Sequence, residues 1–144
     1  MEAKEIKDYK LLGIDYGDTN IGLAFGASGL ASPLKTVSGK NPQTAIHEIA
    51  ALAINNKVTK LVFGIALTHD GKETPQSIKT RQFAKLLKVY LKLPAVFVDE
   101  AHTSMEAQNL MISTGFSKKD RRHGDQYAAT LIIKRFYDEQ AKGS

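Results

Sequence analysis

Three acidic residues stand where acids are unusual, at the ends of apolar segments. Asp15 follows the apolar run 11–14, and Glu100 closely follows the apolar run 95–98. Asp125 lies one helical turn before the first apolar residue of a C-terminal helix, in line with its apolar stripe. An unpaired buried carboxylate is costly. These positions therefore indicate carboxylates held by a cation or by hydrogen bonds.

The chemistry that three converging carboxylates support is metal-dependent hydrolysis. The chain has no Cys and no cluster of His, so the candidate ligands are hard oxygens, which suit Mg²⁺ or Mn²⁺. Two such ions can activate water and stabilise the leaving oxygen in phosphodiester hydrolysis. Each acid alone is more typical of a turn, a strand end or a helix N-cap. The prediction that Asp15, Glu100 and Asp125 are metal ligands and catalytic residues depends on all three together.

The first part of the chain predicts strands that would position the first acid. Residues 11–15 are a short apolar run ending in an acid, residues 17–20 have turn composition, and residues 21–25 alternate at strand spacing. This pattern predicts a β-hairpin. A third strand is expected within residues 30–37, where Pro33 indicates an edge strand or a bulge.

A polar residue followed by a proline marks the predicted start of two helices. Asn41 before Pro42 and Thr74 before Pro75 have the composition of an N-cap followed by the first helical position. The second of these helices is expected to bury an apolar stripe, namely Phe83, Leu86, Leu87, Tyr90 and Leu91.

The remaining elements complete an alternating pattern. Residues 61–65 predict a strand buried on both faces, and residues 95–98 predict the last buried strand. Thr103 with Glu106 predicts a helix start, and a final helix is expected from near Asp125. Its apolar stripe would be Ala129, Ile132, Ile133, Phe136 and Tyr137. Three strands followed by alternating helices and strands predict an α/β fold, a mixed five-stranded sheet flanked by helices.

Length and composition limit the class of protein. A chain of 144 residues predicts one domain, residues 1–144, with residues 1–10 and 139–144 as flexible ends. The absence of Cys excludes a disulfide framework and a thiolate metal site. No apolar run approaches the ~18 residues of a membrane span. We therefore expect a soluble, cytoplasmic protein with no membrane partner. The sequence leaves its oligomeric state open.

A basic segment precedes the third acid. Lys118, Lys119, Arg121 and Arg122 lie just before Asp125, in a chain of net charge +5. Their position favours contact with the phosphates of a nucleic acid beside the carboxylates. A solvated loop with no specific partner is the equally weighted alternative.

Four short motifs occur in order along the chain. They are DYGDTNIG at residues 15–22, GIALTHDG at 64–71, DEAHT at 99–103 and DQYAA at 125–129. Together they resemble the YqgF/RuvX family, whose members carry D-x-G-T-x-x-I-G, G-L-P-L-N-x-D-G and D-E-R-x-T motifs and an aspartate that leads an alanine-rich helix. The similarity runs from about residue 11 to residue 138, nearly the whole chain.

This resemblance implies a ribonuclease H-like fold and a metal-dependent nuclease. It assigns the catalytic acids to Asp15, Glu100 and Asp125, in agreement with the reading of the carboxylates. It implies Mg²⁺ or Mn²⁺ as cofactor. It also implies a structured nucleic acid as substrate, either the 5′ end of pre-16S rRNA or, as the alternative, branched DNA at a Holliday junction.

Several positions depart from the family pattern and keep other functions open. Ala101 replaces the arginine of D-E-R, Asp18 displaces the threonine of D-x-G-T, Asn20 stands at a usually basic position, and Ala66 replaces a proline. Loss of basic side chains would remove phosphate contacts. A non-catalytic scaffold that binds nucleic acid is thus one alternative. A fragment of a sugar-kinase or actin-like ATPase is another, because the first motif resembles the phosphate motif of those enzymes.

Overall fold

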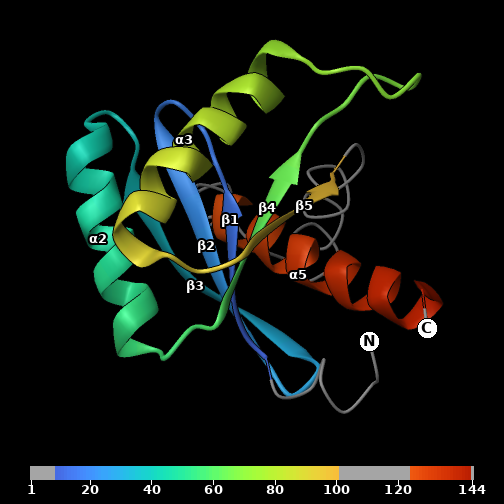
Figure 1. Ribbon diagram of the computed structural model, residues 1–144, viewed down its shortest axis with the longest axis horizontal. Coiled ribbons are helices and arrows are strands. Elements are labelled where there is room, and N and C mark those ends of the chain that lie inside the picture. The colour runs from blue at the N-terminus through green and yellow to red at the C-terminus, as the bar shows by residue number, and fades with distance from the viewer. Residues whose placement is uncertain (1–8, 101–123, 144) are drawn as a thin grey trace.

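The computed structural model describes residues 9–100 and 124–143. Their elements are β1 (Lys10–Asp15), β2 (Asn20–Ala27), β3 (Leu30–Ser38), α2 (Pro42–Asn55), β4 (Lys60–Ile65), α3 (Pro75–Leu91), β5 (Ala95–Asp99) and α5 (Gly124–Gly143). The described strands form one sheet in the order β3-β2-β1-β4-β5 (Figure 1). The predicted helix from Thr103 and the basic segment lie outside the described residues.

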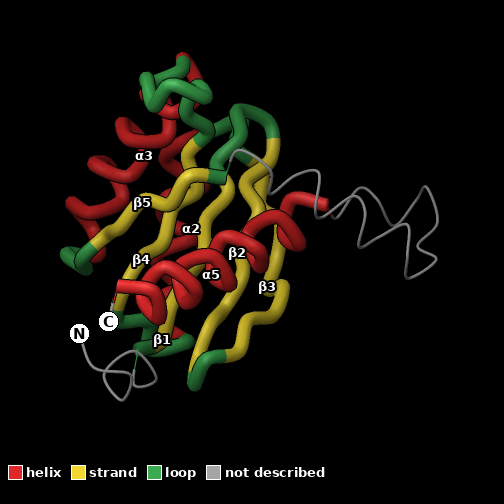
Figure 2. Tube along the Cα trace, turned by 90° about the vertical axis from the view of Figure 1, so that its right-hand side faces the viewer, coloured by secondary structure: helices red, strands yellow, loops and turns green. Residues whose placement is uncertain are grey.

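The sheet is mixed, as predicted. β1 pairs with β2 and β2 with β3 in antiparallel fashion, whereas β4 pairs in parallel with both β1 and β5. The three parallel strands therefore end at the same edge of the sheet. Helices α2 and α3 cover one face and α5 crosses the other (Figures 1 and 2).

Both helices that begin with a proline are capped by the preceding residue, as predicted. The Asn41 side chain accepts a hydrogen bond from the Thr44 backbone N–H at 3.2 Å, with Pro42 in the first turn. At the start of α3, the Thr74 and Ser77 side chains form a reciprocal capping box. The irregularity predicted at Pro33 is confirmed. The pairing of β2 with β3 shifts register between Leu23, which pairs with Lys35, and Ala24, which pairs with Pro33. β3 is also an edge strand of the sheet.

Each face of the sheet has its own apolar cluster. Between the sheet and α2/α3 are packed large side chains that include Leu12, Ile14, Phe63 and Leu87. Between the sheet and α5 the cluster consists of Leu11, Ala24, Val62, Val98, Ala129, Ile132, Ile133 and Phe136. The stripe predicted for the last helix is thus confirmed, although Tyr137 is only partly buried. β4 is buried on both faces, as predicted.

Two predictions about burial were wrong. β5 pairs only with β4 among the described strands, so it is an edge strand, and Val98 is its one fully buried residue. On α3, Leu86 and Tyr90 are 46% and 51% exposed. The helix instead buries Ser77 and Thr80, because hydrogen bonds to the preceding turn satisfy both hydroxyls.

No helix in residues 9–100 or 124–143 combines the length and apolarity needed to cross a membrane.

Candidate active site

The first predicted acid ends β1 on the α5 side of the sheet. Successive side chains of a strand alternate between faces. Ile14 belongs to the α2/α3 cluster and Tyr16 packs on Phe83 of α3. Asp15, which lies between them, therefore points toward α5, and its pairing partner across the hairpin is Gly22 of β2.

The second acid comes from the end of β5. The backbone N–H of Glu100 donates to the carbonyl of Ile65 at 2.8 Å, which continues the parallel pairing by one residue. Its side chain turns toward β4, where a Cβ placed on Gly64 would lie 2.5 Å from Glu100 Oε2. The absence of a side chain at Gly64 thus makes room for the carboxyl group. Oε2 is buried and has no hydrogen-bond partner.

The third acid lies in the first turn of α5. This turn lies directly on β2, because a Cβ on Gly22 would overlap the backbone carbonyl of Asp125. Gly22 is therefore the residue that lets the helix approach, and it is also the residue paired with Asp15. The positive end of the α5 dipole is favourable for negative charge at this point. Asp15, Glu100 and Asp125 are in this way brought to one end of the sheet by three separate elements.

Burial and neighbouring carboxyl groups strongly affect Asp15 and Glu100. Burial, the nearby charge of Asp125 and a hydrogen bond with Glu100 act on Asp15, and the net effect raises its pKa to about 7. Burial, followed by the charge of Asp15, raises the pKa of Glu100 to about 8. The hydrogen bond between the two carboxyl groups lowers the pKa of Asp15 and raises that of Glu100. Burial also raises the pKa of Asp125.

The cluster is a hydrogen-bonded pair with a third acid beside it. Among the residues that the structure describes, no three acids or histidines already have the geometry of a metal centre. What the arrangement provides is a set of hard oxygens that is expensive to ionise unless a cation balances its charge.

One supporting residue carries no sequence signal. Arg135, on the third turn of α5 after Asp125, donates from Nη1 to the backbone carbonyl of Asp99 at 2.8 Å. It ties the residue before Glu100 to the helix that carries Asp125. A lone arginine on an amphipathic helix is indistinguishable in sequence from a solvated one, so the pattern alone could not have found it.

The turn after Asp15 is also held from α3. Gln76 Nε2 donates to the carbonyl of Tyr16 at 2.7 Å, and Lys79 Nζ lies 3.1 Å from Asp18 Oδ2. The charge of Asp18 contributes to raising the pKa of Tyr16, but it is not among the causes of the raised pKa of Asp15. It is therefore a turn residue with a partner on α3 rather than a fourth acid of the cluster.

Comparison with known proteins identifies the family. The family model described as RuvX, Holliday junction resolvase, matches residues 9–139. The chain belongs to the RuvX family. This family consists of nucleases and resolvases, so the chain is an enzyme of the nuclease class.

Relatives of this RuvX chain are similar over almost their whole length. A protein of Roseiflexus sp. (strain RS-1), named "Putative pre-16S rRNA nuclease", is 34% identical over 91% of this chain and 95% of its own. A protein of the same name from Synechococcus sp. is 35% identical over 92% of this chain and 91% of its own.

Solved structures confirm the ribonuclease H-like fold. RuvC of T. thermophilus, solved with a Holliday junction substrate, has a TM-score of 0.59 at 16% identity and covers 92% of this chain and 96% of its own. The Fowlpox virus resolvase, solved with junction DNA, has a TM-score of 0.57 at 9% identity and covers 91% of this chain and 98% of its own.

Proposed function

We propose that this chain is a metal-dependent nuclease whose reaction takes place at Asp15, Glu100 and Asp125, and whose substrate is the 5′ end of pre-16S rRNA. The observation that carries the proposal is the convergence of three partly buried carboxyls, from the ends of β1 and β5 and the start of α5, at one end of the sheet. Buried acids with raised pKa values are typical of functional sites rather than of structural positions.

The residues of the cluster fit a divalent cation. Glu100 Oε2 is a buried acceptor without a partner, in the space that Gly64 leaves open. Asp15 and Glu100 share one hydrogen bond, and a bound cation would take the place of the proton in it. Hard carboxylate oxygens suit Mg²⁺ or Mn²⁺, which Asp15, Glu100 and Asp125 would hold together.

The chain's own groups position the reaction. A bound divalent ion supplies polarisation of the phosphate and a more acidic water. Asp15 and Glu100, fixed by strand pairing, present carboxylate oxygens in a constant orientation. Asp125 adds a third from the positive end of α5. Lys118, Lys119, Arg121 and Arg122, which lie shortly before Asp125 in sequence, would neutralise the phosphates of the substrate strand.

The substrate is inferred from the relatives. Proteins about one-third identical along their full length are named pre-16S rRNA nucleases, which favours rRNA. The family description, Holliday junction resolvase, favours branched DNA as the second candidate. A pre-rRNA substrate implies that the enzyme works in the cytoplasm.

The deciding experiment compares cleavage by the wild type and by Asp15→Asn. We expect the wild type to cleave an RNA spanning the 5′ end of mature 16S rRNA in Mg²⁺ or Mn²⁺ and not in EDTA. Asp15→Asn should lose cleavage and keep its fold, because Asn retains the shape but not the charge that a cation needs. Asp138→Asn, which changes an exposed acid on α5, is the matched control and should remain active.

The other outcomes separate the alternatives. Full activity in Asp15→Asn would contradict the carboxylate site. Cleavage of a four-way DNA junction but not of the RNA would identify branched DNA as the substrate. Binding of both by a wild type that cleaves neither would identify a non-catalytic scaffold.

A further inference from the structure

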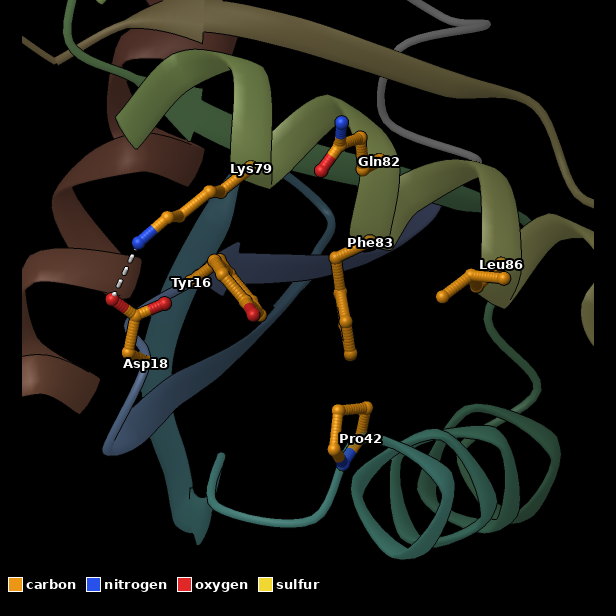
Figure 3. A pocket seen from close by; sticks show the side chains of 7 residues that line it. All are labelled: Tyr16, Asp18, Pro42, Lys79, Gln82, Phe83 and Leu86. Carbon is orange, nitrogen blue, oxygen red and sulfur yellow. Dashed lines mark hydrogen bonds and ion pairs between the residues drawn. The ribbon is translucent and has the colours of Figure 1, made fainter. Parts of the chain in front are cut away.

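A hollow lies on the opposite face of the sheet from the carboxyl cluster. It has a volume of about 280 Å³ and opens between the turn after β1, the start of α2 and the middle of α3 (Figure 3). We call it the α2–α3 hollow. Its walls are Tyr16, Pro42, Phe83 and Leu86, and its polar lining residues are Asp18, Lys79 and Gln82.

The hollow and the cluster share one end of the sheet. Tyr16 is the residue after Asp15, and the two side chains point to opposite faces. The Tyr16 ring lies 4.7 Å from that of Phe83, and the Tyr16 carbonyl accepts a hydrogen bond from Gln76. The position of Tyr16 is therefore fixed from α3. A strand that passes over this end of the sheet would meet the carboxyl groups on one side and the hollow on the other.

The lining combines apolar walls with a few polar groups. Phe83 is buried and forms the floor, Tyr16 is partly buried, and Leu86 is 46% exposed at the rim. The amide of Gln82 can both donate and accept hydrogen bonds, as the edge of a base requires. This mixture of a flat apolar surface and an amide suits an aromatic ring with polar edges.

The ammonium group of Lys79 lies at the hollow and can exchange its ion-pair partner Asp18 for another anion. Lys79 Nζ is 3.1 Å from Asp18 Oδ2, and the two side chains are 50% and 59% exposed (Figure 3). An exposed ion pair of this kind is weak, so a phosphate can take the place of Asp18. The start of α2, which contributes Pro42, has no acid in its first turn, so the acid that a phosphate must displace at the hollow is Asp18.

We propose that the α2–α3 hollow binds one unpaired nucleobase of the substrate strand, with Lys79 on an adjacent phosphate. The proposal rests on the proposed function, since it takes the substrate to be a nucleic acid. A volume of about 280 Å³ is at the small end of ligand pockets, which suits one base and not a segment of a folded partner. Stacking on side chains tolerates any base, so the site would orient the strand more than it selects sequence.

The test measures binding of a labelled single-stranded RNA in EDTA, so that no cleavage takes place. A series of RNAs, each lacking the base at one position, locates the position that matters. We expect one such loss to weaken wild-type binding roughly 5- to 150-fold, the range spanned by stacking of a single base. Leu86→Trp fills the hollow and should abolish this dependence on position.

Val89→Trp is the matched control. Val89 is 69% exposed on the same helix and does not line the hollow, so the same bulk is added elsewhere. It should bind all RNAs as the wild type does. Lys79→Ala should flatten the salt dependence of binding by about 0.7, one contact to a single strand, whereas Lys85→Ala on the exposed side of α3 should not.

The outcomes of this test are independent of catalysis. Equal binding of every RNA in the series by the wild type would overturn the proposal, and so would a Leu86→Trp variant that keeps the dependence on position. A wild type that shows the dependence but cleaves no nucleic acid would confirm the hollow and contradict the proposed function. A wild type that cleaves RNA but ignores single base losses would do the reverse.

Discussion

The two faces of the sheet are built in different ways. On the α2/α3 face, large side chains such as Leu12, Ile14 and Phe63 fill the space between layers. On the α5 face, the sheet presents glycines to the helix, namely Gly13, Gly22, Gly26 and Gly64. Helix α5 consequently lies close to the strands, and at Gly22 the contact is between one backbone and another.

The α2/α3 face therefore contributes mainly to the stability of the domain, and the α5 face mainly to the geometry of the carboxyl cluster. Large buried side chains contribute most of the apolar burial, and the α2/α3 face can therefore carry the stability of the domain. The α5 face gives up side-chain volume at its glycines and gains a fixed distance between helix and sheet. Three carboxyl groups lie in that space. Burial raises the pKa of each, so ionising them in the folded state costs free energy.

Substitutions on adjacent residues of β2 should separate the two faces most strongly. Leu23→Ala removes a buried side chain from the α2/α3 face and should lower the free energy of unfolding by about 2–5 kcal/mol. Gly22→Ala forces a Cβ into the carbonyl of Asp125 and should cost about 1–3 kcal/mol. Urea denaturation measures both.

Cleavage rates should then rank the two variants in the opposite order. At a temperature where both are folded, Leu23→Ala should keep its rate, since no residue of the cluster moves. Gly22→Ala should lose most of its rate, because α5 carries Asp125 away from Asp15. Equal losses of rate in the two variants would mean that the α5 face holds no special geometry.

The pH dependence of stability should be the next largest difference. Asp15 and Glu100 have pKa values of about 7 and about 8 in the fold, against 3.8 and 4.5 for ordinary side chains. The folded state thus binds more protons than the unfolded state between about pH 4 and pH 8. The free energy of unfolding should fall as pH rises through this window.

Unfolding in EDTA over a pH series measures this slope. Asp15→Asn and Glu100→Gln should each reduce the fall and be more stable than the wild type at the alkaline end, because a repelling charge is gone. Asp138→Asn, on the exposed side of α5, should follow the wild type. Identical curves for all four proteins would show that the cluster is not self-repulsive.

The smallest effect on the cleavage rate is expected at Arg135. Arg135→Ala removes the hydrogen bond to the Asp99 carbonyl and should cost about 1–3 kcal/mol. Because Glu100 follows Asp99, kcat should fall several-fold while KM stays constant. Lys134→Ala, at an exposed neighbouring position, serves as the control. An unchanged kcat in Arg135→Ala would make this contact structural only.

Much of the fold could be predicted because its signals are local. The hairpin of β1 and β2, the proline-marked starts of α2 and α3, the buried β4 and the stripe of α5 all follow from spacing within a few residues. The places of the three acids at the ends of their elements could be predicted for the same reason, whereas their role as metal ligands and catalytic residues stays a prediction. Their convergence, though, followed from the topology of the sheet and from family resemblance.

What could not be predicted depends on contacts between distant residues. The burial of Ser77 and Thr80 in place of Leu86 is the exception, because their hydroxyls bond to carbonyls only three and four residues earlier. The partial burial of β5 follows from its place at an edge. The pairing of Lys79 with Asp18 spans 61 residues. Such contacts leave no periodic pattern.

The order in which the chain is synthesised gives the glycine-lined face another consequence. Residues 10–99, which include the five described strands, leave the ribosome before residues 124–143. Until α5 emerges, the nascent sheet has no helix over Leu11, Ala24 and Val62, which it later buries. Asp125 arrives with that same helix. The newly made protein thus completes its third acid and covers its last apolar surface in one docking event, and earlier intermediates are both inactive and prone to associate.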